Sequence, residues 1–447
     1  MLALPEQNAV VIYHRFHGNA VIASKDTVKY LELFNSPQTE EFALEHGGSE
    51  QTQKLFSSSC FLVPEGTDER LQLKELNEAR ASRIANGSLV ANLRFFSANC
   101  NFACSYCSVT HIDRAGYENL IAPTIRFPWK TAKQAVDAFL DLTKRHHHKV
   151  VTIRFFGGEP LLDWPTYRRV VEYVSAQTDR PEVDFYLNTN GALITSEIAA
   201  FLKTHNIKTI VSLDGVGEVN DRLRVTHNGR GTYAVVQKGI EELRVAGVDI
   251  HLNMTLTQQN TAEIHKMIDL CKKLGAKDVG IDDLCFVGNE VVELGTTTKR
   301  QADAIIDAWS YGRKIGIPVL GAWVGFRSFS DTALPLAYCA GNGEEVCVDH
   351  SGKVFPCYGI PCSIGELHNF DSCFVHPVYQ TMALRMVGNI PHCEGCELEG
   401  PCGGGCAADA FAATETVTSI SRDKCEMRKT ITRELIQQWA IAQGGTL

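Results

Sequence analysis

The sequence lacks the features of several protein classes. Its first residues contain no basic segment followed by an apolar core, so they predict no secretory signal. No apolar run reaches the ~18 residues that a membrane span requires. With 43 basic and 52 acidic residues the formal net charge is −9, and no dense basic stripe indicates binding to nucleic acid. We therefore expect a soluble cytoplasmic protein that binds neither nucleic acid nor membrane.

Cysteine, in contrast, is abundant. The chain of 447 residues contains 16 cysteines. Because no secretory signal points to an oxidising compartment, metal-bound thiolates in a reducing cytoplasm explain these cysteines better than disulfides do. The length predicts about three domains.

Three of the cysteines stand close together after an apolar stretch that ends at Phe96. Cys100, Cys104 and Cys107 are separated by gaps of three and two residues. A cubane iron–sulfur cluster has four irons, so three thiolates leave one iron open to a ligand that is not protein. The alternatives are ordinary reduced thiols, or a zinc site whose fourth ligand lies elsewhere.

A glycine-rich turn follows the next β-branched segment, residues 150–156, and reads Gly157-Gly158-Glu159-Pro160. Glycine permits close approach of the backbone to a ligand. This turn and the C-x3-C-x2-C spacing, with an aromatic residue before its last cysteine, resemble the radical S-adenosylmethionine (radical SAM) superfamily. The resemblance implies that SAM chelates the open iron through its amino and carboxylate groups. It also implies that the turn binds the amino group through backbone carbonyls and Glu159.

Repeated βα units are expected from about residue 89 to residue 319, where short β-branched or aromatic runs alternate with amphipathic helices. The candidate strands are Leu89–Phe96, Val150–Phe156, Val183–Thr189, Lys208–Leu213, Asp249–Thr255 and Val279–Leu284. Six units predict an α/β fold with a partial (β/α)6 TIM-like barrel rather than a closed barrel of eight. Its open side would admit a large substrate.

Polar residues end two of these strands, where the functional residues of βα barrels gather. Asn188 and Asn190 end the third strand, Ser212 and Asp214 end the fourth, and Arg224 follows. The resemblance implies that these segments contact the ribose and the carboxylate of SAM, and that Arg224 pairs with the carboxylate in bidentate fashion. For each residue the alternative is a structural turn or a surface ion pair.

The first 88 residues have a different pattern. Residues 10–14 and 20–23 predict a hairpin, 27–34 and 39–45 predict helices, and 56–63 begins as helix and passes into strand. This order resembles the winged-helix module that binds leader peptides by adding a strand to an exposed sheet edge. A plain packing or oligomerisation domain is the alternative.

The C-terminal part contains ten cysteines from Cys339 onward. Cys339, Gly352 and Cys357 are followed by a C-x2-C-x5-C-x3-C run and a last cysteine, and this spacing resembles the SPASM extension of radical SAM enzymes. The resemblance assigns one auxiliary cluster to Cys339, Cys347, Cys357 and Cys406, and a second to Cys393, Cys396, Cys402 and Cys425. Cys362 and Cys373 compete with Cys347 for the first cluster. A pair of zinc knuckles is the alternative for the region.

Together these resemblances predict a radical SAM maturase of ribosomally made peptides. It would hold three [4Fe–4S] clusters, one that binds SAM and two auxiliary, and take electrons from a donor such as flavodoxin or ferredoxin. Reductive cleavage of SAM would give a 5′-deoxyadenosyl radical, which abstracts hydrogen from a precursor peptide and leads to a crosslink or another oxidative modification. The expected domains are a winged-helix-like domain at 1–88, the barrel at 89–325 and the SPASM domain at 326–447.

One residue separates this function from a close alternative. Sulfatase maturases carry Asp, a proton acceptor, after the cysteine that aligns with Cys357, where this chain has Tyr358. The difference argues against formylglycine formation. Tyr358 is our candidate catalytic residue for proton or electron exchange, with a packed aromatic as the alternative. A sulfatase-maturase-like enzyme, a radical enzyme acting on a small molecule and a non-catalytic iron–sulfur electron carrier remain alternatives for the whole protein.

Overall fold

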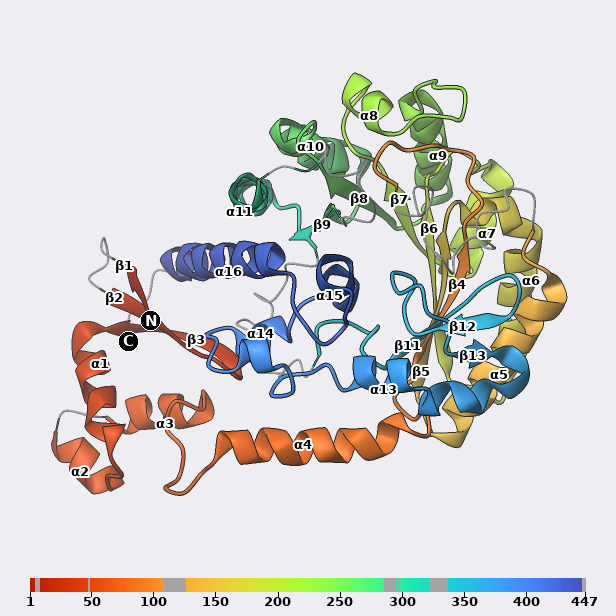
Figure 1. Cartoon of the computed structure of the whole chain (residues 1–447). Coiled ribbons are helices and arrows are strands. Elements are labelled where there is room, and N and C mark those ends of the chain that lie inside the picture. Colours follow the sequence, from red (N-terminus) through yellow and green to blue (C-terminus); the bar gives the residue numbers. More distant parts are fainter. Residues whose placement is uncertain are drawn as a thin grey trace.

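The structure is a computed structural model that describes residues 1–4, 9–46, 49–107, 126–284, 295, 297–321 and 337–443. Within these residues the strands form a three-stranded and a ten-stranded sheet. Figure 1 shows the small sheet at one end of the molecule and the large sheet at the other, with helix α4 (Glu69–Ile84) running between them.

Six parallel strands in chain order make up the centre of the large sheet. They are β4 (Asn92–Ser97), β5 (Val150–Gly157), β6 (Glu182–Thr189), β7 (Lys208–Ser212), β8 (Ile250–Leu256) and β9 (Val279–Asp283). All six were predicted from the sequence, with ends that differ by at most three residues. The predicted α/β class with a mostly parallel sheet is confirmed.

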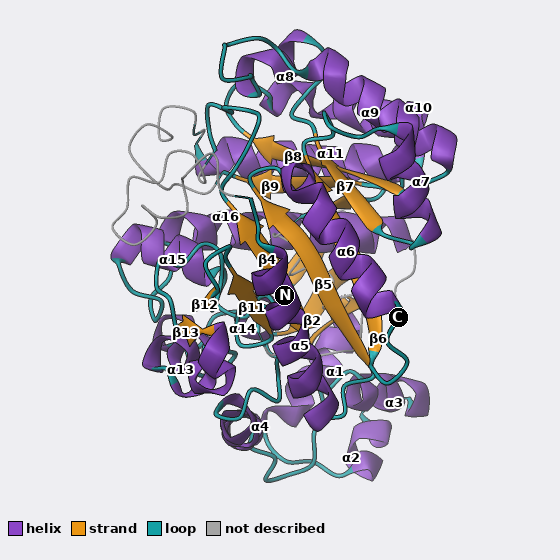
Figure 2. Ribbon diagram, turned by 90° about the vertical axis from the view of Figure 1, so that its right-hand side faces the viewer, coloured by secondary structure: helices purple, strands orange, loops and turns teal. Residues whose placement is uncertain are grey.

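Helices cover the outer face of this sheet, and Figure 2 shows α5 and α6 in front of β5 and β6. The helices are α5 (Trp129–Arg145), α6 (Trp164–Ser175), α7 (Ser196–Thr204), α8 (Glu218–Leu223), α9 (Tyr233–Ala246), α10 (Ile264–Leu274) and α11 (Thr298–Ile315), with the short turns η3 (Pro160–Asp163) and η4 (Thr261–Glu263). Their apolar stripes pack on alternate strand residues such as Phe95, Phe155 and Val211, which are almost fully buried. Alternation along each strand sends the next residues to the inner face.

The cysteine-rich part continues the same sheet. β11 (Glu345–Val348) pairs in parallel with β4, and β12 (Lys353–Phe355) and β13 (Gly365–Glu366) follow in antiparallel order. On the far side β10 (Val319–Leu320) pairs with β9. β10 and β13 are the two ends of the sheet, which is therefore open among the residues described.

Short helices follow β13. They are η7 (Leu367–Val375), α13 (Pro377–Ala383), η8 (Pro391–Cys393), α14 (Glu399–Cys402), α15 (Ala407–Thr414) and the long α16 (Arg422–Gln443). Helix α16 packs along α11, and its Lys424 pairs with Asp283 at the end of β9. The C-terminal helix thus fixes the cysteine-rich part to the barrel.

The N-terminal module consists of the antiparallel strands β1 (Leu2–Leu4), β2 (Ala9–His14) and β3 (Gly18–Ser24), then α1 (Lys25–Glu32), η2 (Leu33–Asn35), α2 (Glu40–Glu45) and α3 (Glu50–Ser58). The predicted hairpin and the two predicted helices are present. The predicted strand toward Val63 is wrong. Phe61 and Leu62 donate their backbone N–H groups to the carbonyl oxygen of Phe56, so the chain folds back over the end of α3 instead of extending.

Helix α4 was not predicted. It packs against the cysteine-rich part through polar side chains, since Asn77 Nδ2 donates to the carbonyl of Val387 at 3.0 Å and Arg80 Nη2 to that of Asn342 at 2.9 Å. Among the helices described, none combines the length and the apolar character needed to cross a bilayer.

Candidate active site

The three closely spaced cysteines lie in the loop that follows β4. Main-chain hydrogen bonds of 2.7 and 3.0 Å tie this loop to residues 223–225, directly after α8. Burial raises the pKa of Cys100 to about 12 and that of Cys104 to about 11. The charges of Cys104 and Cys107 add to the shift at Cys100, so the three thiols form one group. Iron must displace their protons, because it binds thiolates.

The glycine-rich turn after β5 packs directly on this cysteine loop. A Cβ atom at Gly158 would lie 2.0 Å from the carbonyl oxygen of Asn99, and one at Gly157 would lie 2.1 Å from that of Ser97. The same two carbonyl oxygens accept backbone hydrogen bonds from the turn: the N–H of Gly158 donates to Ser97 O at 2.5 Å, and the N–H of Glu159 donates to Asn99 O at 2.6 Å. The two glycines are therefore required for the contact between turn and loop.

The carboxylate of Glu159 joins the turn to the end of β6. It accepts hydrogen bonds from the N–H of Leu161 at 2.9 Å, the hydroxyl of Thr189 at 2.8 Å and the N–H of Asn190 at 2.6 Å. The side chain is fully buried, and burial raises its pKa to about 7. Pro160 follows as the first residue of η3. The structure thus gives Glu159 three partners within the protein itself.

Of the residues predicted at the strand ends, Asn190 contacts the same loop. Asn190 Nδ2 donates to Asn101 Oδ1 at 2.8 Å, within the cysteine loop. Asn188 faces the inner side of the sheet, where its Oδ1 lies 3.5 Å from Arg154 Nη1. Ser212 is half-buried at the end of β7.

Arg224 belongs to a buried network beside the cysteines. Its Nη1 donates to the hydroxyl of Tyr106 at 2.5 Å and lies 3.3 Å from Asp214 Oδ2, to which Tyr106 also donates. Asp214 Oδ1 accepts from the N–H of Thr255 at 2.8 Å. The Nε of Arg224 is buried without a hydrogen-bond partner among the residues described. The Arg224 charge lowers the pKa of Cys104, which burial raises, so a spare cationic donor lies near the thiols.

Several of the cysteines assigned to the first C-terminal group lie near one another. A Cβ on Gly341 would lie 3.4 Å from Cys339 Sγ and 3.8 Å from Cys357 Sγ, so these two sulfurs share one space. Burial is the main cause of the raised pKa of Cys406, and the charges of Cys339 and Cys357 raise it further. Cys347 is buried on β11, where burial is the main cause and Cys357 a further cause of its raised pKa. We call these four residues the first group.

The two competing cysteines have different surroundings. Cys373 is fully buried in the main core, with its Sγ 2.7 Å from the Cβ position of Gly365. Cys362 is half-buried and shares a small apolar cluster with Cys357 and Cys406. Cys362 therefore lies beside the first group, while Cys373 packs as a small core residue.

The second group consists of Cys393, Cys396, Cys402 and Cys425. Burial raises the pKa of Cys393 to about 12, and the charges of the other three cysteines all contribute. The four thiols therefore lie near one another.

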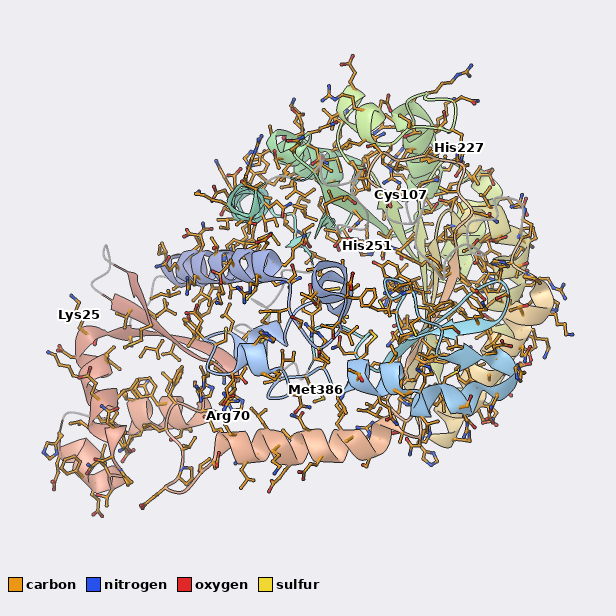
Figure 3. The ribbon with its side chains drawn as sticks, viewed as in Figure 1. Lys25, Arg70, Cys107, His227, His251 and Met386 are labelled. Carbon is orange, nitrogen blue, oxygen red and sulfur yellow. The ribbon has the colours of Figure 1, made fainter. Side chains whose placement is uncertain are left out.

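The tip of the β2–β3 hairpin packs on the loop of the second group. The N–H of Gly400 donates to the carbonyl of Arg15 at 2.8 Å, and a Cβ at Gly400 would lie 1.7 Å from the carbonyl oxygen of Phe16. At the start of α4 (Figure 3), Arg70 donates to both carboxylate oxygens of Glu399 at 2.9 Å. The N-terminal module thus contacts the second group directly.

Tyr358 lies between the barrel and the first group. Its ring centre is 4.7 Å from that of Phe156 and 6.2 Å from that of Phe96, both on the inner face. The guanidinium of Arg94 lies 5.0 Å from its ring centre, and the neighbouring residue is Cys357. Its position fits either an aromatic spacer or a group that exchanges protons or electrons.

Sequence reasoning missed several residues that position this site. Thr189 and Asn101 brace Glu159 and Asn190, and His227 Nε2 lies 3.0 Å from the carbonyl oxygen of Cys100. Figure 3 shows His227 and Cys107 on the same side of the molecule, next to α9. Tyr106 had a signal, as the aromatic before the last cysteine. The others had none, because their partners are distant in sequence.

The donor set fits an iron–sulfur cluster with a carboxylate-bearing ligand. Three buried thiols in one loop would hold the iron, and the spare donor of Arg224 suits an anionic group. The sequence of residues 95–271 matches the family model of the Radical SAM superfamily. Residues 95–271 form a radical SAM domain. Such a domain implies SAM and a [4Fe–4S] cluster as cofactors.

The similarity to known proteins extends beyond that domain. The radical SAM cyclopropyl synthase TigE of Paramaledivibacter caminithermalis is 24% identical over 97% of this chain and 93% of its own. Native anSMEcpe with bound AdoMet has a TM-score of 0.66 at 16% identity, covering 79% of this chain and 99% of the other. Streptococcus suis SuiB bound to precursor peptide SuiA has a TM-score of 0.57 at 14% identity, covering 93% and 97%. The two structural likenesses show the fold, and the predicted radical SAM resemblance is confirmed.

Proposed function

We propose that the protein is a radical SAM maturase that introduces a crosslink or another oxidative modification into a ribosomally made precursor peptide. The observation that supports this most is the combination of one three-cysteine loop with two further groups of four cysteines in the same folded chain. The similarity to TigE and to SuiB, which was solved with a precursor peptide, points the same way.

In this proposal Cys100, Cys104 and Cys107 hold the cluster that binds SAM. When bound, SAM and the cluster supply a 5′-deoxyadenosyl radical that removes hydrogen from an unactivated carbon. Arg224 binds the SAM carboxylate with its spare buried donor, and Asp214 and Tyr106 keep the guanidinium in place. The residues assigned to further SAM contacts are Gly157, Gly158, Glu159, Pro160, Asn188, Asn190, Ser212 and Asp214.

The two C-terminal groups would each hold an auxiliary [4Fe–4S] cluster. Four thiolates in each group leave no open iron, which suits electron transfer better than substrate binding. An oxidative modification needs such an acceptor, because closing a bond from a substrate radical releases a second electron. An external donor such as flavodoxin or ferredoxin would supply the electron that starts the reaction.

Tyr358 would act between the substrate and the first group. A Tyr358→Phe variant keeps the ring that stacks on Phe156 and removes only the hydroxyl. If the hydroxyl moves a proton, we expect modified peptide to fall while 5′-deoxyadenosine continues to form. Equal product from both proteins would leave Tyr358 a packed aromatic.

The N-terminal module is the proposed site for a leader peptide. In the described part of the chain β3 has no neighbouring strand on its outer side, so its edge is available for an added strand. Removing the leader from a peptide substrate should therefore raise its KM more than it lowers kcat. Equal kinetics with and without the leader would favour a packing domain.

The first experiment measures 5′-deoxyadenosine from the anaerobically reconstituted protein with SAM and a strong reductant. The control is a variant with Cys100, Cys104 and Cys107 changed to Ala. Product that depends on these cysteines, followed by a mass change in a short peptide encoded beside the gene, supports the proposal. No product from protein with all its clusters would favour the electron-carrier alternative. Formylglycine in a sulfatase-derived peptide would instead favour the sulfatase-maturase alternative.

A further inference from the structure

A row of cations crosses the inner face of the barrel. The strand register places Arg94 of β4 beside Arg154 of β5, Arg154 beside Tyr186 of β6, and Tyr186 beside Lys208 of β7. Residues side by side in a parallel sheet point to the same face. Their chain neighbours, such as Phe155, are buried against the outer helices, so this row faces the interior of the barrel.

Two of the three cations in this row have a carboxylate partner. Arg94 Nη2 donates to Glu345 Oε2 at 2.8 Å, and Lys208 Nζ lies 3.3 Å from Asp184 Oδ2. Arg154 forms no ion pair with any residue in the described ranges. Its contacts are a 3.5 Å hydrogen bond to Asn188 Oδ1 and stacking at 4.6 Å from the ring centre of Tyr186.

An unpaired cation in this position is unfavourable. Burial lowers the pKa of Arg154 and the neighbouring charge of Arg94 lowers it further, while the charge of Glu345, the ion-pair partner of Arg94, acts in the opposite direction. The guanidinium nevertheless stays protonated at neutral pH. Glu345 already pairs with Arg94 and forms no ion pair with Arg154, so an anion that arrives with a ligand would offset part of the cost of burying the Arg154 charge.

A ligand has access to this part of the barrel. A cavity of about 650 Å³ lies on the inner face of β6 to β9, toward the ends at which these strands begin, and its lining includes Tyr186, Lys208, His251 and Asn253. Pockets that hold small ligands are typically ~300–1,000 Å³. The ring of Tyr186, on which Arg154 stacks, forms part of the cavity wall, so the guanidinium lies behind this ring and next to the cavity.

We propose that Arg154 binds a carboxylate of the substrate peptide inside the barrel. This inference rests on the proposed peptide function and names the substrate class: a peptide with an acidic side chain near the attacked residue, or one bound by its C-terminal carboxylate. Arginine pairs with carboxylates through two parallel hydrogen bonds, which fixes orientation as well as position. Such an anchor would hold the target C–H group in place.

Two other anions compete for this role. The thiolates of the first group are one, but Cys347 pairs in register with Arg94 rather than with Arg154, and its charge acts on Arg94. The carboxylate of SAM is the other, for which Arg224 has the spare donor. If Arg154 served either of these anions, its replacement would change the iron content or the SAM affinity. If Arg154 binds the peptide, both should stay the same.

The test compares Arg154→Gln and Arg154→Lys with wild type on a peptide that the wild type modifies. Arg168→Gln, a change at a partly exposed arginine on the outer helix α6, is the control and should behave as wild type. We expect Arg154→Gln to lower kcat/KM by ~30-fold or more, with partial recovery in Arg154→Lys. Iron content and SAM affinity should stay within about twofold of wild type, since neither depends on this anchor.

Peptide variants identify the source of the carboxylate. Each Asp or Glu is changed to its amide, and a separate peptide receives a C-terminal amide. The change that removes the bound carboxylate should lower kcat/KM with the wild-type protein. With Arg154→Gln the same change should not lower kcat/KM any further. Arg154→Glu should gain activity on a peptide with Lys at that position, which tests the contact even where Arg154→Gln folds poorly.

Several results would overturn this inference. Wild-type kcat/KM in Arg154→Gln would show that Arg154 does not bind the substrate carboxylate. Weakened SAM binding or lost clusters in this variant would show that Arg154 supports a cofactor instead. The inference would also be refuted if each amide change in the peptide lowered kcat/KM equally with wild type and with Arg154→Gln. If the wild type modifies no peptide while it cleaves SAM, the proposed peptide function itself fails, and the peptide anchor fails with it.

Discussion

The contact between the glycine turn and the cysteine loop makes a sharp prediction for Gly158→Ala. The new Cβ would lie 2.0 Å from the carbonyl oxygen of Asn99, whereas Cβ atoms essentially never come closer than 3.0 Å. The two backbones must therefore separate by at least 1.0 Å. Overpacking of this kind costs ~1–3 kcal/mol. Because Asn99 directly precedes Cys100, the strain falls on the first thiol of the triad.

We expect this variant to lose the cluster of the triad while keeping the two proposed auxiliary clusters. Anaerobic reconstitution should give roughly eight of about twelve irons per chain. A displacement of ~1 Å also predicts a loss of ~100-fold in 5′-deoxyadenosine formation. Gly275→Ala is the control, because a Cβ there meets nothing within 4 Å and only its φ of +70° is strained. Full iron content and normal SAM affinity in Gly158→Ala would refute the proposed role of this contact.

Three further predictions follow from the site. Burial raises the pKa of Glu159 from an ordinary 4.5 to about 7 in the folded protein. Between these two pH values folding takes up a proton, so the stability of the protein falls as the pH rises from about 5 to 7. Glu159→Gln should flatten the dependence of Tm on pH, and an unchanged slope would contradict the shift. Arg224→Lys should weaken SAM binding ~10-fold or more in equilibrium dialysis, because lysine lacks the planar guanidinium that donates two parallel hydrogen bonds. Arg222→Lys, a change at an exposed residue nearby, should leave SAM binding unchanged. Glu399→Gln weakens the bidentate pair with Arg70 of α4 and should destabilise the protein by about 1–2 kcal/mol, measured as a lower Tm; an unchanged Tm would contradict a stabilising role for this pair.

The six central strands were predictable because each carries a short β-branched or aromatic run of its own. Buried residues such as Phe95, Leu187 and Val211 each lie within such a run, and these runs can be recognised in the sequence alone. The cysteine groups were predictable for a related reason. Metal ligands must meet at one centre, so their spacing is a constraint that survives in the sequence.

Other elements have no such local signal. The buried face of α4 carries Leu73, Asn77, Arg80 and Ile84, a helical spacing in which two of the four residues are polar. Hydrophobic periodicity cannot detect a helix whose packing depends on polar contacts. The parallel pairing of β11 with β4 joins segments that are about 250 residues apart. Only the folded chain brings them together.

The second group of cysteines argues against treating residues 1–88 as a separable domain. Gly400 lies so close to Phe16 that no side chain fits between them, and Glu399 is buried under Arg70. A deletion of the N-terminal module would therefore uncover the loop of the second group as well as remove the β3 edge. Lost turnover in such a deletion would not distinguish lost leader binding from a damaged cluster. Leader truncation on the peptide separates the two, because it leaves every contact within the protein intact.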